Sequence, residues 1–178
     1  MSAAAVDLRA HIRDIPDFPK PGIVFKDITP LLLDAAATDA AITQMADWAR
    51  PREPDFVVAA EARGFILGTA LARELGAGFV PARKPGKLPA DTVSAEYILE
   101  YGVDALEVHA DALSHGARVL IHDDLLATGG TALALAELVE KIGGRVVGFA
   151  FLIELAFLGG RERLEGYDVQ ALIGYDAE

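Results

Sequence analysis

Apolar and polar residues follow one another in blocks along the chain, and these blocks predict strands and helices in alternation. Short, nearly continuous apolar runs are typical of strands buried on both faces, whereas a period of three to four residues is typical of helices. The predicted strands are Phe56–Ala60, Phe79–Ala82, Tyr97–Tyr101, Leu106–His109, Val119–Asp123 and Val146–Ile153. The predicted helices are Val6–Arg13, Thr38–Trp48 with Thr38 or Asp39 near its cap, Gly64–Leu75 and Gly130–Lys141.

Buried strands alternating with helices predict an α/β fold, with a central and mainly parallel sheet covered by helices on both faces. Two segments interrupt this pattern. The proline-rich stretch Ile15–Gly22 predicts an ordered, non-helical arm, because proline fixes φ and lacks an N–H donor. The polar stretch Lys84–Ala95 predicts a mobile loop, followed by a hairpin across Gly102.

Composition limits the possible class of protein. The chain has 178 residues, which favours one domain over residues 1–178, and it has no cysteine for disulfides or thiolate chemistry. Its net charge of −11 argues against a nucleic-acid partner. There is no apolar run long enough for a transmembrane helix and no secretory pattern at the start, so we expect a cytoplasmic protein without a membrane partner.

The segment Val119–Thr131 carries the clearest candidate chemistry. Its apolar strand ends in the adjacent carboxylates Asp123 and Asp124, which suit the vicinal hydroxyls of a ribose. The following residues, Ala127, Thr128, Gly129, Gly130 and Thr131, offer free backbone N–H groups at the start of a helix, where a phosphate can bind. The alternative, a buried strand with a glycine-capped turn, leaves the paired carboxylates unexplained.

Two further loops carry cations that could bind pyrophosphate. Arg63 follows the strand Phe56–Ala60, where a guanidinium and loop amides can act together, although a surface arginine at a helix start is the plain alternative. Arg83, Lys84 and Lys87 lie in the loop Arg83–Pro89, which we call the basic loop. Taken alone, it would be read as an ordinary solvated loop. These local cations would have to attract a polyanion to an acidic protein, because solvent ions screen the mean field beyond about 8–10 Å.

The segment Val119–Thr131 resembles the phosphoribosyl-pyrophosphate (PRPP) signature of the type I phosphoribosyltransferases, over a long match without gaps. Pro21–Pro30, Leu99–Gly102, Glu61–Phe65 and Arg83–Lys87 resemble the adenine-specific members of that family. The resemblance extends from about Ile12 to Leu164. It implies the type I fold, with an N-terminal helix and adenine-binding arm in residues 1–33 and a flexible catalytic loop and hairpin in residues 84–105.

The resemblance also implies a reaction and its ligands. The enzyme would be a pentosyltransferase of purine salvage that joins the phosphoribosyl group of PRPP to N9 of adenine, giving AMP and pyrophosphate with inversion. Mg²⁺ would bind with the pyrophosphate and the ribose hydroxyls rather than in a dedicated protein site. A homodimer would be expected, in which Arg83 could reach the partner's site.

The family pattern assigns the adenine site to four residues. Val24 and Lys26 would bind the edge of the base through backbone groups, and Phe25 would stack on the ring opposite Leu125. A carbonyl at Val24 and an N–H at Lys26 match the 6-amino group and N1 of adenine, whereas hypoxanthine and guanine reverse both groups. A buried core aromatic is the commoner fate of a single phenylalanine and is the alternative for Phe25.

Glu100 would be the catalytic acid or base, exchanging a proton with a ring nitrogen of adenine. A hairpin edge with one exposed acid is the plain alternative. The ribose would be bound by Asp123 and Asp124. The residues implied at the pyrophosphate are Glu61, Ala62, Arg63, Arg83, Lys84, Lys87 and Tyr101, with a cis peptide at Glu61–Ala62.

His122 departs from the family pattern, in which Val or Ile is usual. It predicts a packed histidine with a hydrogen-bond partner, and a catalytic role is the minor alternative. Two rival functions remain open at this point. One is transfer to hypoxanthine, guanine or xanthine, and the other is a non-catalytic PRPP-sensing module.

Overall fold

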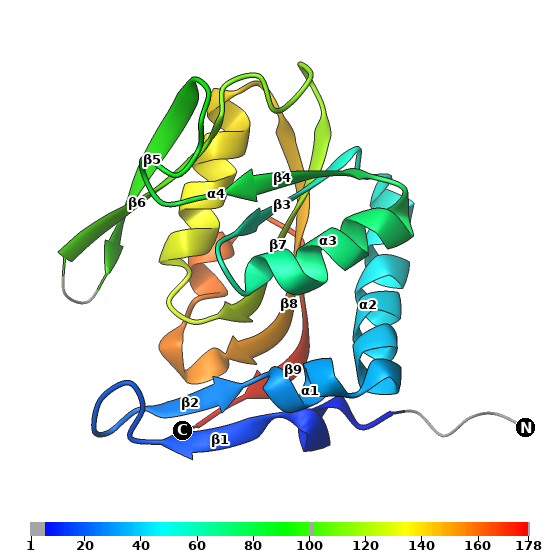
Figure 1. Ribbon diagram of the computed structural model, residues 1–178, viewed down its shortest axis with the longest axis vertical. Coiled ribbons are helices and arrows are strands. Elements are labelled where there is room, and N and C mark those ends of the chain that lie inside the picture. Colours follow the sequence, from blue (N-terminus) through cyan, green and yellow to red (C-terminus); the bar gives the residue numbers. More distant parts are fainter. Residues whose placement is uncertain (1–5, 100–101, 178) are drawn as a thin grey trace, which may run out of the picture.

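The computed structural model describes residues 6–99 and 102–177, and its elements follow the predicted alternation (Figure 1). The helices are α1 Thr29–Leu33, α2 Ala35–Ala49, α3 Gly64–Leu75 and α4 Gly130–Lys141, with 3-10 turns η1 Leu8–His11, η2 Arg50–Arg52, η3 Ala156–Leu158 and η4 Glu162–Leu164. The strands are β1 Arg13–Pro16, β2 Val24–Asp27, β3 Phe56–Ala60, β4 Gly78–Ala82, β5 Thr92–Leu99, β6 Gly102–His109, β7 Arg118–Leu126, β8 Arg145–Leu155 and β9 Val169–Tyr175.

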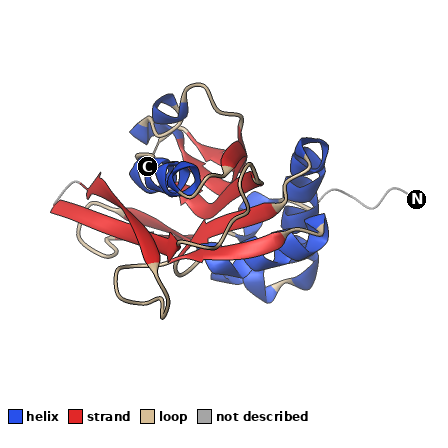
Figure 2. Ribbon diagram, turned by 90° about the horizontal axis from the view of Figure 1, so that it is seen from above, coloured by secondary structure: helices blue, strands red, loops and turns tan. Residues whose placement is uncertain are grey.

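Five strands form a parallel sheet in the order β4-β3-β7-β8-β9, which confirms the predicted α/β class. Its two faces are both covered, by α2 and α3 on one side and by α4 on the other (Figures 1 and 2). The hydrophobic core of the described residues has two clusters, one that includes α4 (the α4 cluster) and one that includes α2 and α3. On β7, Val119 and Ile121 pack in the α4 cluster, whereas Leu120 packs in the cluster of α2 and α3. Burial on both faces explains why these strands are apolar without alternation.

Two antiparallel hairpins stand outside the central sheet (Figure 1). The hairpin of β1 and β2 forms the N-terminal arm, beside α1 and near the end of β9. The longer hairpin of β5 and β6 packs Ala95, Leu106 and Val108 into the α4 cluster. The isolated pairing of Arg83 with Glu107 ties the start of the basic loop to β6.

Several predicted boundaries were wrong. The expected helix Val6–Arg13 is only the 3-10 turn η1, because Arg13 already pairs with Asp27 in the arm. Helix α2 begins at Ala35, three residues before the predicted start. Asp34 caps it by accepting hydrogen bonds from the N–H groups of Ala36 and Ala37.

The second half of the chain also differs from the prediction. Strand β5 begins at Thr92, inside the expected loop Lys84–Ala95, because Thr92 pairs with His109. Strand β7 continues to Leu126, so the paired aspartates lie within the strand. Strand β9 was not predicted. Within the described residues, no helix is long and apolar enough to cross a membrane.

Candidate active site

The residues Ala127–Thr131, which we call the phosphate turn, connect β7 to α4. Gly129 adopts φ +83°, a left-handed conformation that glycine takes without strain, and Gly130 begins the helix. The turn lines a cavity of about 210 Å³ together with Arg63, Asp123, Asp124 and Leu125. The first amides of α4 have no partner within the helix, so the turn presents donors to this cavity.

Asp123 and Asp124 give the cavity its acceptors. The Asp124 side chain is 6% exposed, and Asp123 is half-buried and accepts a hydrogen bond from the Asp124 N–H at 2.9 Å. Burial and the neighbouring charge of Asp124 raise the pKa of Asp123 well above its usual value. Burial also raises the pKa of Asp124, although the Arg63 charge opposes the shift. A Cβ at Gly64 would lie 2.8 Å from Asp123 Oδ1, so a glycine there keeps the carboxylate in place.

Arg63 joins the carboxylates to the N-terminal arm. Its Nε lies 3.0 Å from Asp124 Oδ2, and its guanidinium carbon lies 4.8 Å from the centre of the Phe25 ring. The ion pair lacks hydrogen-bond geometry, so within the described part of the chain Asp124 Oδ2 is buried without a hydrogen-bond donor. Asp124 Oδ2 is therefore available to accept a hydrogen bond from a ligand. The predicted cis peptide at Glu61–Ala62 is present just before Arg63.

The arm places Phe25 beside the cavity rather than in the core. Its ring is half-buried and packs edge-on against Phe18 at 5.2 Å, with Arg63 over it. The Lys26 side chain is 3% exposed, and its Nζ lies 2.8 Å from Asp14 and 4.2 Å from the centre of the Tyr175 ring. Lys26 therefore has only its backbone to offer a ligand. Among the described strands, β2 pairs with β1 alone, which leaves the other edge of Val24–Lys26 without a strand.

The basic loop is anchored outside the cavity. Glu61 accepts the Lys84 N–H and lies 3.5 Å from Arg83 Nη2, and Lys84 Nζ lies 2.9 Å from Asp104. Burial works to raise the pKa of Glu61, but the Lys84 amide and the Arg83 charge hold it below its usual value. Glu61 thus organises the basic loop. Lys87 belongs to the same loop, and none of its three cations lines the cavity.

Three predicted features complete the comparison with the sequence. Glu100 and Tyr101 lie outside the described residues. His122 is fully buried, and its Nδ1 lies 2.9 Å from the Ala150 carbonyl oxygen, which confirms a packed histidine with a partner. Phe151 in the wall of the cavity and Gly160 beside the phosphate turn were not predicted. The glycine pair Gly159–Gly160 was the available signal for the latter.

Comparison with known proteins shows the family of this chain. The family model described as phosphoribosyl transferase domain matches residues 29–171. The adenine phosphoribosyltransferase of Thermotoga neapolitana is 60% identical over 170 residues, covering 96% of this chain and 100% of the relative. The chain belongs to the adenine phosphoribosyltransferase family. The resemblance drawn from the sequence is therefore confirmed, together with the glycosyltransferase class that the family name states.

Solved structures of this family share the fold. The enzyme of Thermoanaerobacter pseudethanolicus has a TM-score of 0.92 and 57% identity, covering 94% of this chain and 98% of that one. The Giardia lamblia enzyme, solved with 9-deazaadenine, has a TM-score of 0.92 and 38% identity, covering 99% of this chain and 100% of that one. Both coverages are nearly complete, so the arm, the sheet and the hairpin all belong to the shared fold.

Proposed function

We propose that the cavity between the phosphate turn and Arg63 binds PRPP, and that adenine adds to its anomeric carbon to give AMP and pyrophosphate. The single observation that carries this proposal is the placement of the phosphate turn beside Asp123 and Asp124 in one cavity. The turn offers amide donors to the terminal phosphate of the sugar, and the two carboxylates offer acceptors to the ribose hydroxyls. One ligand with both groups, a ribose 5-phosphate unit, matches this arrangement.

Adenine would bind between the arm and the cavity. We propose that Phe25 stacks on the base opposite Leu125, while the Val24 carbonyl accepts from the 6-amino group and the Lys26 N–H donates to N1. The strand-free edge of β2 and the engaged Lys26 side chain support a role for the backbone. The Giardia relative is a complex with 9-deazaadenine, and the Saccharomyces cerevisiae enzyme, 38% identical, is a complex with adenine.

The pyrophosphate would lie toward Arg63 and the basic loop. We propose that Arg63 and the Glu61–Ala62 backbone contact it, and that Arg83, Lys84, Lys87 and Tyr101 complete the pyrophosphate site. Lys84 would have to exchange Asp104 for the ligand, and it is more than half exposed and able to move. A loop that closes in this way excludes water from the reacting atoms.

The donor set of the cavity fits Mg²⁺ brought by the substrate. No group of three or more acidic or histidine side chains within the described ranges could hold a metal by itself. Mg²⁺ commonly relies on phosphate oxygens and water, with few protein ligands. It would therefore bind with the pyrophosphate and the ribose hydroxyls, and Asp123 and Asp124 would hold those hydroxyls. When bound, it neutralises charge on the leaving pyrophosphate.

The reaction then needs one bond to break and one to form. The bond from the anomeric carbon to pyrophosphate breaks with its electron pair, through an oxocarbenium-like state, and N9 of adenine supplies the new pair from the opposite face. Adenine must lose one proton, and we propose that Glu100 accepts it at a ring nitrogen. Asp123 and Asp124 stabilise the positive charge that develops on the sugar.

The direct test is to mix PRPP, adenine and Mg²⁺ with the protein and to measure pyrophosphate and AMP. We expect both products in equal amounts, and we expect hypoxanthine or guanine to compete poorly. Hypoxanthine outcompeting adenine would contradict the base assignment. Binding of PRPP without release of pyrophosphate would indicate a sensing module instead. We also propose that the protein is a cytoplasmic homodimer. Light scattering of the purified protein tests whether it is a dimer.

A further inference from the structure

Gly160, between η3 and η4, lies directly against the phosphate turn. A Cβ atom on Gly160 would lie 2.1 Å from the carbonyl oxygen of Ala127 and 3.1 Å from the backbone nitrogen of Gly129. The first distance is far below any contact between a carbon and an oxygen that are not bonded. The φ of Gly160 is outside the left-handed region, so glycine is needed here for space and not for conformation.

The contact is reciprocal. A Cβ on Gly129 would lie 2.8 Å from the carbonyl oxygen of Gly160 and 3.3 Å from the Cβ of Arg163. The two backbones therefore meet at glycines on both sides. Because each segment leaves no room for a methyl group on the other, the position of one determines the position of the other.

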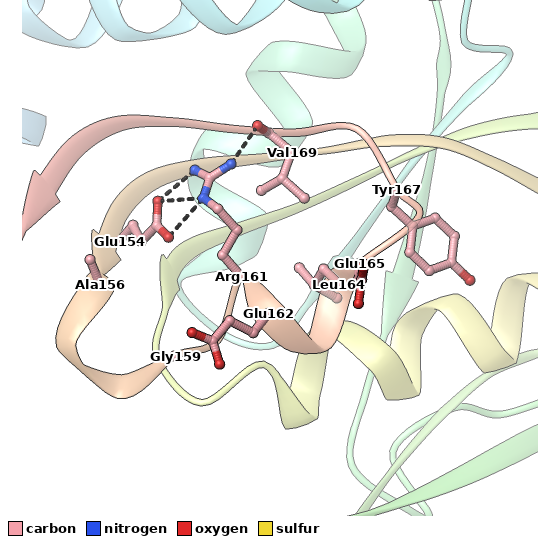
Figure 3. A pocket seen from close by; sticks show the side chains of 9 residues that line it. All are labelled: Glu154, Ala156, Gly159, Arg161, Glu162, Leu164, Glu165, Tyr167 and Val169. Carbon is pink, nitrogen blue, oxygen red and sulfur yellow. Dashed lines mark hydrogen bonds and ion pairs between the residues drawn. The ribbon is translucent and has the colours of Figure 1, made fainter.

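Arg161 follows Gly160 directly in the chain, and its guanidinium is fixed by two neighbouring strands (Figure 3). The Arg161 guanidinium donates to both carboxylate oxygens of Glu154, at 2.5 to 3.1 Å, and to the Val169 carbonyl oxygen at 2.9 Å. Glu154 is 8% exposed near the end of β8, and Val169 begins β9. We call this arrangement the Arg161 clamp. It connects the segment that carries Gly160 to two strands of the central sheet.

The clamp also lines a cavity of about 730 Å³, whose wall includes Ala156, Gly159 and Leu164 (Figure 3). The buried polar group of that cavity is Glu154, and its two carboxylate oxygens are both engaged by Arg161. Because this buried carboxylate is already paired with Arg161, the contact favours a structural role for the clamp over a second ligand site.

We propose that Gly160 is a positioning residue for the phosphate turn, and that the Arg161 clamp sets its distance from the turn. This inference rests on the proposed role of the turn as the 5-phosphate site. With Gly160 in place, the amides of Ala127–Thr131 are held in one arrangement before the ligand arrives, so that less ordering is needed on binding. A side chain at Gly160 would displace the Ala127 carbonyl and with it the amides that follow.

The test compares Gly160→Ala with Gly174→Ala. Gly174 lies in β9, where an added Cβ would have no atom of the described residues within 4 Å and φ is outside the left-handed region. Binding of ribose 5-phosphate alone and of adenine alone is measured by calorimetry, and unfolding is followed by heat. We expect Gly160→Ala to weaken ribose 5-phosphate by about tenfold to about 100-fold, with adenine binding within about twofold. Gly174→Ala should leave both affinities unchanged.

If the role of Gly160 is merely structural, Gly160→Ala will lower the Tm alone or will lower both affinities equally. Either result, without a selective loss of ribose 5-phosphate binding, would overturn the inference. If Gly160→Ala does not fold, the pair Arg161→Lys and Arg161→Ala replaces it. We expect Arg161→Ala to weaken ribose 5-phosphate selectively. Arg161→Lys, which keeps the charge but not the fork, should recover part of the affinity. Equal affinities in the wild type and Arg161→Ala would contradict the clamp.

Failure of the proposed function is separable from failure of this inference. Amide chemical shifts of Ala127–Thr131 in the wild type should respond to ribose 5-phosphate. If they do not, the phosphate site lies elsewhere and the proposed function fails. If they do respond, and Gly160→Ala binds as tightly as the wild type, only the positioning role fails.

Discussion

The guanidinium carbon of Arg63 lies 4.8 Å from the centre of the Phe25 ring, so the cation covers a face of the aromatic side chain. The same guanidinium pairs with Asp124 at 3.0 Å. Arg63 thus connects the arm that would bind the base to the carboxylates that would bind the sugar. A cation over an aromatic face contributes about 0.5–2 kcal/mol of stabilisation. A base that stacks on the Phe25 ring can replace this contact with one of similar strength.

Replacing Phe25 with Ala should weaken adenine selectively. Base stacking on an aromatic side chain contributes about 1–3 kcal/mol, so we expect the KM for adenine to rise by about tenfold to about 100-fold. The KM for PRPP should change little, because the phosphate turn and the carboxylates remain. Phe157→Ala, which removes a partly exposed ring outside the cavity, is the matched control. Equal increases in both KM values would contradict a stacking role.

Replacing Asp123 with Asn should stabilise the protein at neutral pH while impairing PRPP binding. The folded pKa of Asp123 is raised by burial and by Asp124, so the folded state binds this proton more tightly than the unfolded state. The proton on Asp123 therefore stabilises the folded state fully at pH values below 3.8, the pKa in the unfolded state. This stabilisation is lost as the pH rises through the pKa in the folded state. We expect Asp123→Asn to raise Tm by about 2–4 °C at pH 7 and by less as the pH falls.

Kinetics and a surface control complete that experiment. The KM for PRPP should rise by about tenfold or more, because a charged acceptor to a ribose hydroxyl is lost. Asp111→Asn changes an exposed acid and should alter neither Tm nor KM. If the difference in Tm between Asp123→Asn and the wild type grows as the pH falls, the charged form of Asp123 is not disfavoured in the folded state.

His122 should make the protein sensitive to mild acid. Burial lowers its pKa from 6.5 to about 4, and the hydrogen bond with Ala150 only partly opposes this. Between these values the unfolded state binds more protons, so the free energy of unfolding falls as the pH drops from 6.5 to 4, by about 3 kcal/mol at most. Denaturant unfolding of His122→Val across this range should show a flatter profile, with kcat little changed at neutral pH. Parallel profiles would show that His122 does not titrate on unfolding.

Glu100→Gln should separate turnover from binding. An amide cannot accept the proton that adenine loses, so we expect kcat to fall by about 100-fold to about 10,000-fold while AMP binding changes much less. Glu96→Gln, an exposed acid on β5 of the same hairpin, is the control and should keep full activity. Unchanged turnover in Glu100→Gln would remove this residue from the mechanism.

The sequence by itself determined the layered α/β fold and the chemistry of its main loop. Strand Phe56–Ala60 and the helices Gly64–Leu75 and Gly130–Lys141 were predicted with the bounds that the structure has. The local pattern of each element, an apolar run or a helical period, is enough to predict its burial. Glycine or polar residues mark the ends of each element. The carboxylate pair and the phosphate turn could likewise be interpreted from neighbours in the chain.

Only the tertiary structure decided which distant groups meet. The arm strands and β9 were missed because their short, mixed patterns become strands only through pairing with partners elsewhere in the chain. Nothing near Arg63 in the sequence indicates that it contacts Phe25, and nothing near Lys84 points to Asp104. Gly160 meets the phosphate turn because the segment that joins η3 to η4 packs against the turn in the folded chain. Local pattern encodes how deeply a residue is buried, whereas the partner of a loop side chain depends on the path of the whole chain.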